Sequence, residues 1–118
     1  MRVLAVIPAF RVSGQIVDVV TQTREYVEHI LVIDDACPEN SGELITERFE
    51  TSDDVTVVRH DENLGVGGAM KSGFHWALDS GFDIVVKVDG DGQMDPSLIP
   101  ALIKPIIDGD ADYTKGNR

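Results

Sequence analysis

The strongest constraint on the fold is an alternation of short β-branched runs with longer segments of helical periodicity. The β-branched runs cover residues 3–7, 30–33, 55–58 and 84–88. This alternation is typical of parallel strands joined by crossover helices. The second run is continuously apolar, as expected for a strand that is buried on both faces. The pattern therefore predicts a single α/β domain, residues 1–118, built around a mostly parallel sheet.

Helices are expected between these strands and after the last one. They cover residues 14–28, a short segment around 44–49, residues 65–80 and a segment that begins at Asp95 and Pro96. The first should turn one apolar face to the sheet, formed by Ile16, Val19, Val20, Thr23 and Val27. Gly81 should end the third helix in the left-handed conformation. Pro105 should kink or stop the last helix, because it removes a backbone hydrogen bond and clashes with the preceding turn. A fifth strand is expected within residues 112–118.

Composition and charge exclude several classes of protein. Ten Lys and Arg against 21 Asp and Glu give a net charge of −11, which argues against a surface that tracks nucleic-acid phosphates. The apolar runs are too short, and too close to charges, to cross a hydrocarbon layer of ~30 Å. The amino terminus does not resemble a secretory signal, and the single Cys37 cannot form an internal disulfide. We therefore expect a cytoplasmic protein with no nucleic-acid partner.

Two acidic clusters follow predicted strands. Asp34 and Asp35 come after the second strand, and Asp89, Gly90 and Asp91 come after the fourth. A right-handed β-α-β series leaves the carboxyl ends of all its strands at one edge of the sheet, and ligands of such folds bind in the crevice there. We therefore expect both clusters to face one pocket.

The second cluster has the composition of a site for a hard cation. Two carboxylates one residue apart repel each other by ~1 kcal/mol in water and ~4 kcal/mol at intermediate dielectric, so they need a counter-charge. Oxygen ligands without a nearby His or Cys favour Mg²⁺ or Mn²⁺ over Zn²⁺. An isolated Asp-x-Asp is equally compatible with a solvated acidic turn, so the pair alone leaves both interpretations open.

Five segments in order extend this pattern over nearly the whole chain. They read LAVIPAF, ILVIDDACPENSG, NLGVGGAMKSGFHWAL, VVKVDGDGQMDP and ADYTKGNR. Together they resemble the family 2 glycosyltransferases, most of all the polyprenyl-phosphate branch that includes dolichol-phosphate mannosyltransferase-like proteins. The resemblance implies a three-layer α-β-α, Rossmann-like nucleotide-diphosphosugar fold called GT-A, of which this chain would be the amino-terminal, donor-binding portion.

The resemblance also implies a set of site residues. Pro8, Ala9 and Phe10 would line the nucleotide pocket, Asp35 would accept hydrogen bonds from the base, and Asp89 would lie near the ribose and the metal. Asp91 would act in catalysis through a Mg²⁺ or Mn²⁺ ion that bridges the diphosphate. The implied nucleotide-binding residues are Pro8, Ala9, Phe10, Asp35, Gly65, Asp89, Gly90 and Arg118, and the implied metal ligands are Asp89, Asp91 and Gln93.

The implied function is a metal-dependent, inverting transfer of a sugar from a nucleoside diphosphate sugar to a polyprenyl phosphate or a saccharide. In the complete protein this would take place at the cytosolic face of a membrane. Family members carry roughly another hundred residues with the acceptor site and a general base, which this chain lacks, so we expect it to bind metal and nucleotide weakly and to turn nothing over. An exposed edge strand would favour a homodimer.

Some features depart from the family pattern or permit other interpretations. Residues 11–13 read Arg-Val-Ser, where family members often have Asn-Glu. A phosphoacceptor receiver domain is one alternative, although its Asp pair should follow the first strand. A catalytically inactive nucleotide-sugar-binding fragment is another. His29, His60 and His75 show no ligand spacing and are expected to be surface or packing residues. Phe74 and Trp76 are expected in the core, and Cys37 is expected to be an ordinary thiol.

Overall fold

The computed structural model describes residues 2–92 and 95–108. Its elements alternate between strands and helices, as the sequence predicts. In order they are β1 (Val3–Ala9), α1 (Ile16–Thr23), β2 (His29–Asp34), α2 (Ser41–Arg48), β3 (Val55–Arg59), α3 (Gly65–Ser80), β4 (Ile84–Lys87), a 3₁₀ turn η1 (Pro96–Leu98) and α4 (Ile99–Ile107).

The four strands form one parallel sheet in the order β3-β2-β1-β4. From β1 the chain moves outward through β2 to β3, and α3 then carries it back across the sheet to β4, on the other side of β1. Val6 of β1 thus pairs with Leu31 of β2 on one side and with Lys87 of β4 on the other. Such a reversal of strand order creates a crevice at the carboxyl end of the central strands, where α/β folds bind ligands.

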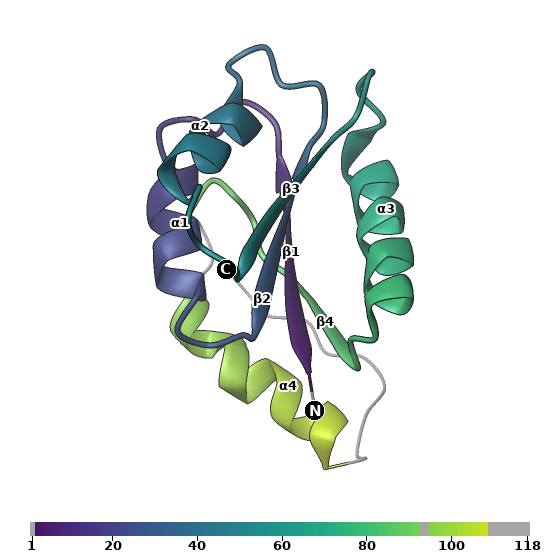
Figure 1. Cartoon of the computed structure of the whole chain (residues 1–118). Helices are drawn as coiled ribbons and strands as arrows, with labels where there is room; N and C mark the ends of the chain where they lie inside the picture. Colours follow the sequence, from purple (N-terminus) through teal and green to yellow (C-terminus); the bar gives the residue numbers. More distant parts are fainter. Residues whose placement is uncertain (1, 93–94, 109–118) are drawn as a thin grey trace.

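Helices cover both faces of the sheet (Figure 1). Successive strand residues point to opposite faces, so Ala5 and Ile7 pack in the core with α1, α2 and α4, whereas Leu4 and Val6 pack with α3. This arrangement explains why the strand runs are continuously apolar, and it confirms the predicted three-layer α-β-α class with a mostly parallel sheet.

The glycines of α3 allow the helix to lie close to the sheet. A Cβ placed on Gly73 would come within 2.7 Å of Val6 Cγ1, which is closer than real Cβ contacts allow. The helix ends as predicted at Gly81, whose φ of 79° is left-handed. The first turn of α3 is thereby held beside the carboxyl ends of β1 and β2.

Two predicted helix boundaries are wrong. The first helix ends at Thr23 rather than residue 28, because the Thr23 carbonyl accepts a tight-turn hydrogen bond from Tyr26 N–H; Val27 still packs against the same core. The predicted stop at Pro105 is also wrong, since α4 runs on to Ile107. Only two helical residues follow this proline, so the ring removes one backbone hydrogen bond near an end that is already weakly bonded.

Two further findings concern the end of the chain. Asp95 caps η1 by accepting a hydrogen bond from Ser97 N–H at 3.0 Å, as the Asp-Pro pair predicts. The fifth strand expected at residues 112–118 lies outside the described residues. Across residues 2–92 and 95–108, the structure contains no helix that is long and apolar enough to span a membrane.

Candidate functional site

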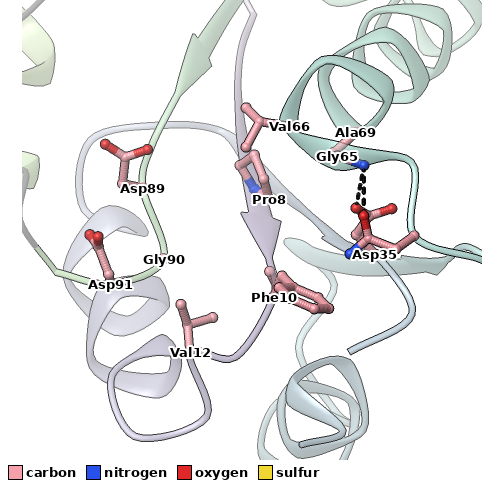
Figure 2. A pocket seen from close by; sticks show the side chains of 12 residues that line it. Pro8, Phe10, Val12, Asp35, Gly65, Val66, Ala69, Asp89, Gly90 and Asp91 are labelled. Carbon is pink, nitrogen blue, oxygen red and sulfur yellow. Dashed lines mark hydrogen bonds between the residues drawn. The ribbon is translucent and has the colours of Figure 1, made fainter. Parts of the chain in front are cut away.

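A pocket of about 300 Å³ opens at the carboxyl edge of the sheet, where the strand order reverses. It lies between the end of β1, the segment after β4 and the first turn of α3 (Figure 2). Its lining comprises Pro8, Ala9, Phe10, Val12, Asp35, Asn63, Gly65, Val66, Ala69, Asp89, Gly90 and Asp91. The nucleotide- and metal-binding residues that the resemblance implies within the described part of the chain therefore all line this pocket.

The end of β1 forms the floor of the pocket. Pro8 and Ala9 are the last residues of the strand, and Phe10 follows with 41% of its surface exposed. The Arg11 guanidinium lies 5.4 Å from the centre of the Phe10 ring. Phe10 thus offers a flat apolar surface, with a cation beside it, to a pocket whose charged lining residues are all acidic.

Only one member of the Asp34–Asp35 pair reaches the pocket. Asp34 is buried, and its two carboxylate oxygens accept the N–H groups of Cys37 at 2.8 Å and Gly42 at 3.1 Å. Adjacent side chains at a strand end point to opposite faces, so Asp34 is directed to the start of α2 while Asp35 faces α3. The expectation that both carboxylates face the crevice is therefore wrong for Asp34.

Asp35 caps the amino terminus of α3 from thirty residues away. Its Oδ1 accepts hydrogen bonds from Leu64 N–H at 2.9 Å and from His60 Nδ1 at 2.7 Å, and its Oδ2 accepts from Gly65 N–H at 2.8 Å. Burial alone would raise the pKa of this carboxyl, but the hydrogen bonds from His60, Leu64 and Gly65 outweigh it and hold the pKa below its ordinary value. Asp35 is therefore an ionised acceptor at the pocket wall.

Asp89 and Asp91 lie on the other side of the pocket from Asp35, with Pro8 between them (Figure 2). Asp89 Oδ1 is 3.2 Å from Lys87 Nζ. Gly90, between the two acids in sequence, packs closely against α1 and the loop before it, because a Cβ there would lie 3.1 Å from both Val12 and Ile16. Residues more than fifty positions apart thus share one pocket, as predicted from the parallel topology.

The chemistry of the pocket fits a hard divalent cation. Asp89 and Asp91 supply two carboxylates, and within residues 2–92 and 95–108 no cluster of three or more His, Cys, Asp or Glu could enclose an ion. Mg²⁺ typically binds to one or two carboxylates and completes its shell with water and substrate phosphates, which matches this donor set. Gln93, the third implied metal ligand, and Arg118, an implied nucleotide-binding residue, lie outside the described residues.

The sequence did not reveal every residue at the site. His60, expected to be a surface or packing residue, has only 10% of its side chain exposed and bridges Asp35 to Ser72 Oγ. Asn63, Val66 and Ala69 also line the pocket. The sequence indicated these residues only through the predicted helix 65–80, because the first turn of a helix that follows a strand lies at the carboxyl edge of the sheet.

Two other expectations are corrected. Phe74 is 50% exposed rather than buried in the core. Cys37 is buried, with Sγ accepting a hydrogen bond from Arg11 N–H at 3.0 Å. Burial would raise the pKa of this thiol, but hydrogen bonds from Ser41 and from the Arg11 backbone hold the pKa below its ordinary value. Cys37 thus anchors the loop that carries Phe10 and Arg11, a role that spacing alone does not indicate.

The chain belongs to glycosyl transferase family 2, whose family model matches residues 5–118. Membership in this family excludes the receiver-domain alternative. The chain is 32% identical over its whole length to undecaprenyl-phosphate mannosyltransferase from Micrococcus luteus, covering 49% of that protein. It is 35% identical over 76% of its length to polyprenol monophosphomannose synthase from Mycolicibacterium smegmatis, covering 34% of that protein. The expected family and branch are thereby confirmed, and the chain spans half or less of the length of these relatives.

A solved structure shows the same fold. The mannosyltransferase PcManGT from Pyrobaculum calidifontis, in complex with GDP-Man and Mn²⁺, superposes with a TM-score of 0.67 at 24% sequence identity. The match covers 76% of this chain and 27% of that chain. The likeness shows that the two proteins share an architecture.

Proposed function

We propose that this chain is the donor-binding part of a glycosyltransferase that moves a sugar from a nucleoside diphosphate sugar to a polyprenyl phosphate. The observation that carries the proposal is the convergence of Asp35, Asp89 and Asp91 on one pocket at the reversal of strand order. The named activities of the relatives from Micrococcus luteus and Mycolicibacterium smegmatis support a polyprenol-linked acceptor, and the GDP-Man and Mn²⁺ bound by PcManGT support the donor class and the metal.

Each side of the pocket has its own part in binding the donor. Asp35 accepts hydrogen bonds from the base, and Pro8, Ala9 and Phe10 form the apolar surface beside it. Across the pocket, Asp89 and Gly90 lie beside the ribose and diphosphate. Asp89 and Asp91, with Gln93 as a further ligand, hold a Mg²⁺ or Mn²⁺ ion. When bound, the ion supplies positive charge that stabilises the departing nucleoside diphosphate.

The proposed reaction is a direct displacement that inverts the anomeric carbon. The acceptor oxygen forms a bond to that carbon as the bond to the diphosphate oxygen breaks, and the electron pair of the broken bond leaves on the diphosphate. Asp91 would hold the metal, whose charge would stabilise the leaving diphosphate. This chain spans half or less of the length of the relatives named above, and its part in the proposed reaction is to bind the donor.

Calorimetry with GDP and with UDP in the presence of Mn²⁺ tests this proposal. We expect Asp91→Asn to weaken nucleotide binding about tenfold or more, because it removes one carboxylate from the metal. Asp79→Asn, which changes an exposed acid near the far end of α3, should leave binding unchanged. Equal affinities for the wild-type chain and Asp91→Asn would overturn the metal role, and no binding of either nucleotide to the wild-type chain would overturn the proposed function.

A further inference from the structure

His60 occupies a bridging position directly after β3. Its backbone N–H donates to the Asp34 carbonyl at 2.8 Å, so the residue extends the ladder between β2 and β3 by one step. Its ring lies between Asp35 Oδ1, 2.7 Å from Nδ1, and Ser72 Oγ, 2.8 Å from Nε2. The imidazole therefore connects a strand end, the pocket carboxylate and the second turn of α3.

The bonding partners determine which ring nitrogen carries hydrogen. An ionised carboxylate can only accept hydrogen bonds, so His60 Nδ1 donates to Asp35. In the neutral ring Nε2 is then an acceptor, and the Ser72 hydroxyl donates to it. This chain of two hydrogen bonds fixes the plane of the ring, and the ring in turn fixes the carboxylate of Asp35.

Asp35 depends on this support because of where it lies. Its side chain is only 3% exposed, and a buried carboxylate stays ionised only when hydrogen-bond donors replace water. The Leu64 and Gly65 N–H groups supply part of this donation at the start of α3. The His60 ring adds a donor from a different element, which prevents the carboxylate from rotating about its axis.

We infer that His60 is a positioning residue that presents Asp35 to the nucleobase as an oriented, acceptor-only carboxylate. This inference rests on the proposed function. The consequence is a preference among bases. Guanine and uracil carry a hydrogen on the ring nitrogen of their pairing edge, whereas adenine and cytosine carry a lone pair there. An acceptor-only group favours the first two and repels the lone pairs of the others. His60 thus acts on base selection through Asp35, without touching the ligand.

The test measures base discrimination rather than affinity alone. Binding of GDP, ADP, UDP and CDP is compared in Mg²⁺ for the wild-type chain, His60→Leu, His60→Asn and the exposed control His75→Leu. We expect the wild-type chain to prefer GDP over ADP, or UDP over CDP, by about tenfold or more. His60→Leu should reduce that ratio to about one. His60→Asn should retain most of it, because the amide can donate to Asp35 from nearly the same place.

The outcomes separate this inference from the proposed function. If the wild-type chain binds none of the four nucleotides, the proposed function fails and the inference fails with it. If it binds them without discrimination, or if His60→Leu discriminates as well as the wild-type chain, the inference alone fails. Mn²⁺ binding in the absence of nucleotide should be the same in all four proteins, because the His60 ring bonds to Asp35 and Ser72, and Asp35 lies across the pocket from Asp89 and Asp91 (Figure 2). If His60→Leu does not fold, Ser72→Ala gives a second measurement, because it removes only the hydrogen bond to His60 Nε2. A base-discrimination ratio in Ser72→Ala equal to that of the wild-type chain would also overturn the inference.

Discussion

At the residue scale, the adjacent carboxylates of Asp34 and Asp35 have different roles because the backbone directs them to opposite faces of the sheet. Asp34 is fully enclosed by the N–H groups of Cys37 and Gly42 and ties the start of α2 to the end of β2. Gly42 must be glycine there, since a Cβ would lie 2.5 Å from Asp34 Oδ2. Asp35 caps α3 and also lines the pocket, so it combines a structural role with a binding role.

The lowered pKa of Asp35 predicts how stability depends on pH. The folded pKa lies below the ordinary value of about 3.9, so the unfolded chain binds the proton more readily. The contribution of Asp35 to stability is therefore complete above about pH 5 and is lost as the pH falls through its folded pKa. We expect Asp35→Asn to flatten the dependence of the unfolding free energy on pH between about pH 5 and pH 3, as measured by urea unfolding at a series of pH values.

The control for that measurement is Asp79→Asn, since Asp79 is exposed on α3 and its removal should leave the slope unchanged. If Asp35→Asn and the wild-type chain lose stability in parallel as the pH falls, the hydrogen bonds to Asp35 do not lower its pKa in solution.

The sequence places Asp35, Asp89 and Asp91 at one edge of the sheet, but it does not indicate the role of His60. The acids directly follow strands, and the carboxyl ends of parallel strands lie at the same edge of the sheet. The contacts of His60 depend on the register of β3 against β2 and on the rotation of α3, which brings Ser72 within 2.8 Å. Neither quantity is encoded in local spacing, and a single histidine after a strand is compatible with many surroundings.

At the scale of the elements, the close approach of α3 to the sheet yields a matched pair of predictions. Gly73→Ala should destabilise the fold by about 1–3 kcal/mol, because the new Cβ meets Val6 Cγ1 at 2.7 Å in a well-packed core. Gly67→Ala, in the same helix, should stabilise it by about 0.4–1 kcal/mol, because a Cβ there meets nothing within 4 Å and alanine restricts the unfolded chain. Chemical denaturation of the two variants measures both changes.

The pair isolates packing from helix propensity, because both substitutions make the same chemical change in one helix. Effects of equal sign and size would show that α3 does not contact β1 as closely as the structure indicates. Nucleotide binding should weaken in Gly73→Ala more than in Gly67→Ala, since displacing α3 also moves Gly65 and Val66 at the pocket wall.

The elements were predictable where local signals dominate. The Gly81 end of α3 and the Asp95 cap follow from backbone preferences of single residues, and both are found. The ends of α1 and α4 differ from the predictions. Apolar periodicity predicts a first helix that includes Val27, and the proline rule predicts that the last helix kinks or stops at Pro105. In both cases the outcome depends on tertiary packing: Val27 reaches the core from a turn, and α4 is held by Ile103 and Ile106 against it.

At the scale of the whole molecule, the order β3-β2-β1-β4 makes the pocket. Each β-α-β unit alone would place its acids at some strand end, but only the reversal at β1 leaves room between them for a ligand. The sequence predicts parallel strands and a shared edge, and the pairing of β4 with β1 rather than with β3 adds the crevice. Strand order is a property of the assembled sheet, so it could not be obtained from the strand runs one by one.

The charge of the whole molecule predicts an unusual response to salt. The chain carries −11, and three of its acids, Asp35, Asp89 and Asp91, line the pocket, so a metal-free nucleoside diphosphate is repelled. Salt shortens the screening length from ~30 Å at 0.01 M to ~10 Å at 0.1 M, which weakens this repulsion. Without divalent metal, we therefore expect GDP to bind severalfold more tightly as NaCl is raised over that range, as measured by calorimetry.

Guanosine is the matched probe, because it keeps the base and ribose but has no phosphate, and its affinity should change little with salt. With Mn²⁺ present, the affinity for GDP should depend less on salt, because the bound cation would neutralise the charge of the pocket acids that repels the diphosphate. The opposite result, metal-free GDP that binds more weakly as salt rises, would mean that a cation of the protein dominates the field in the pocket. The candidates are then Arg11, 5.4 Å from the Phe10 ring, and Lys87, 3.2 Å from Asp89 Oδ1. Comparing Arg11→Gln with Lys87→Gln shows which of the two reverses the sign of the dependence.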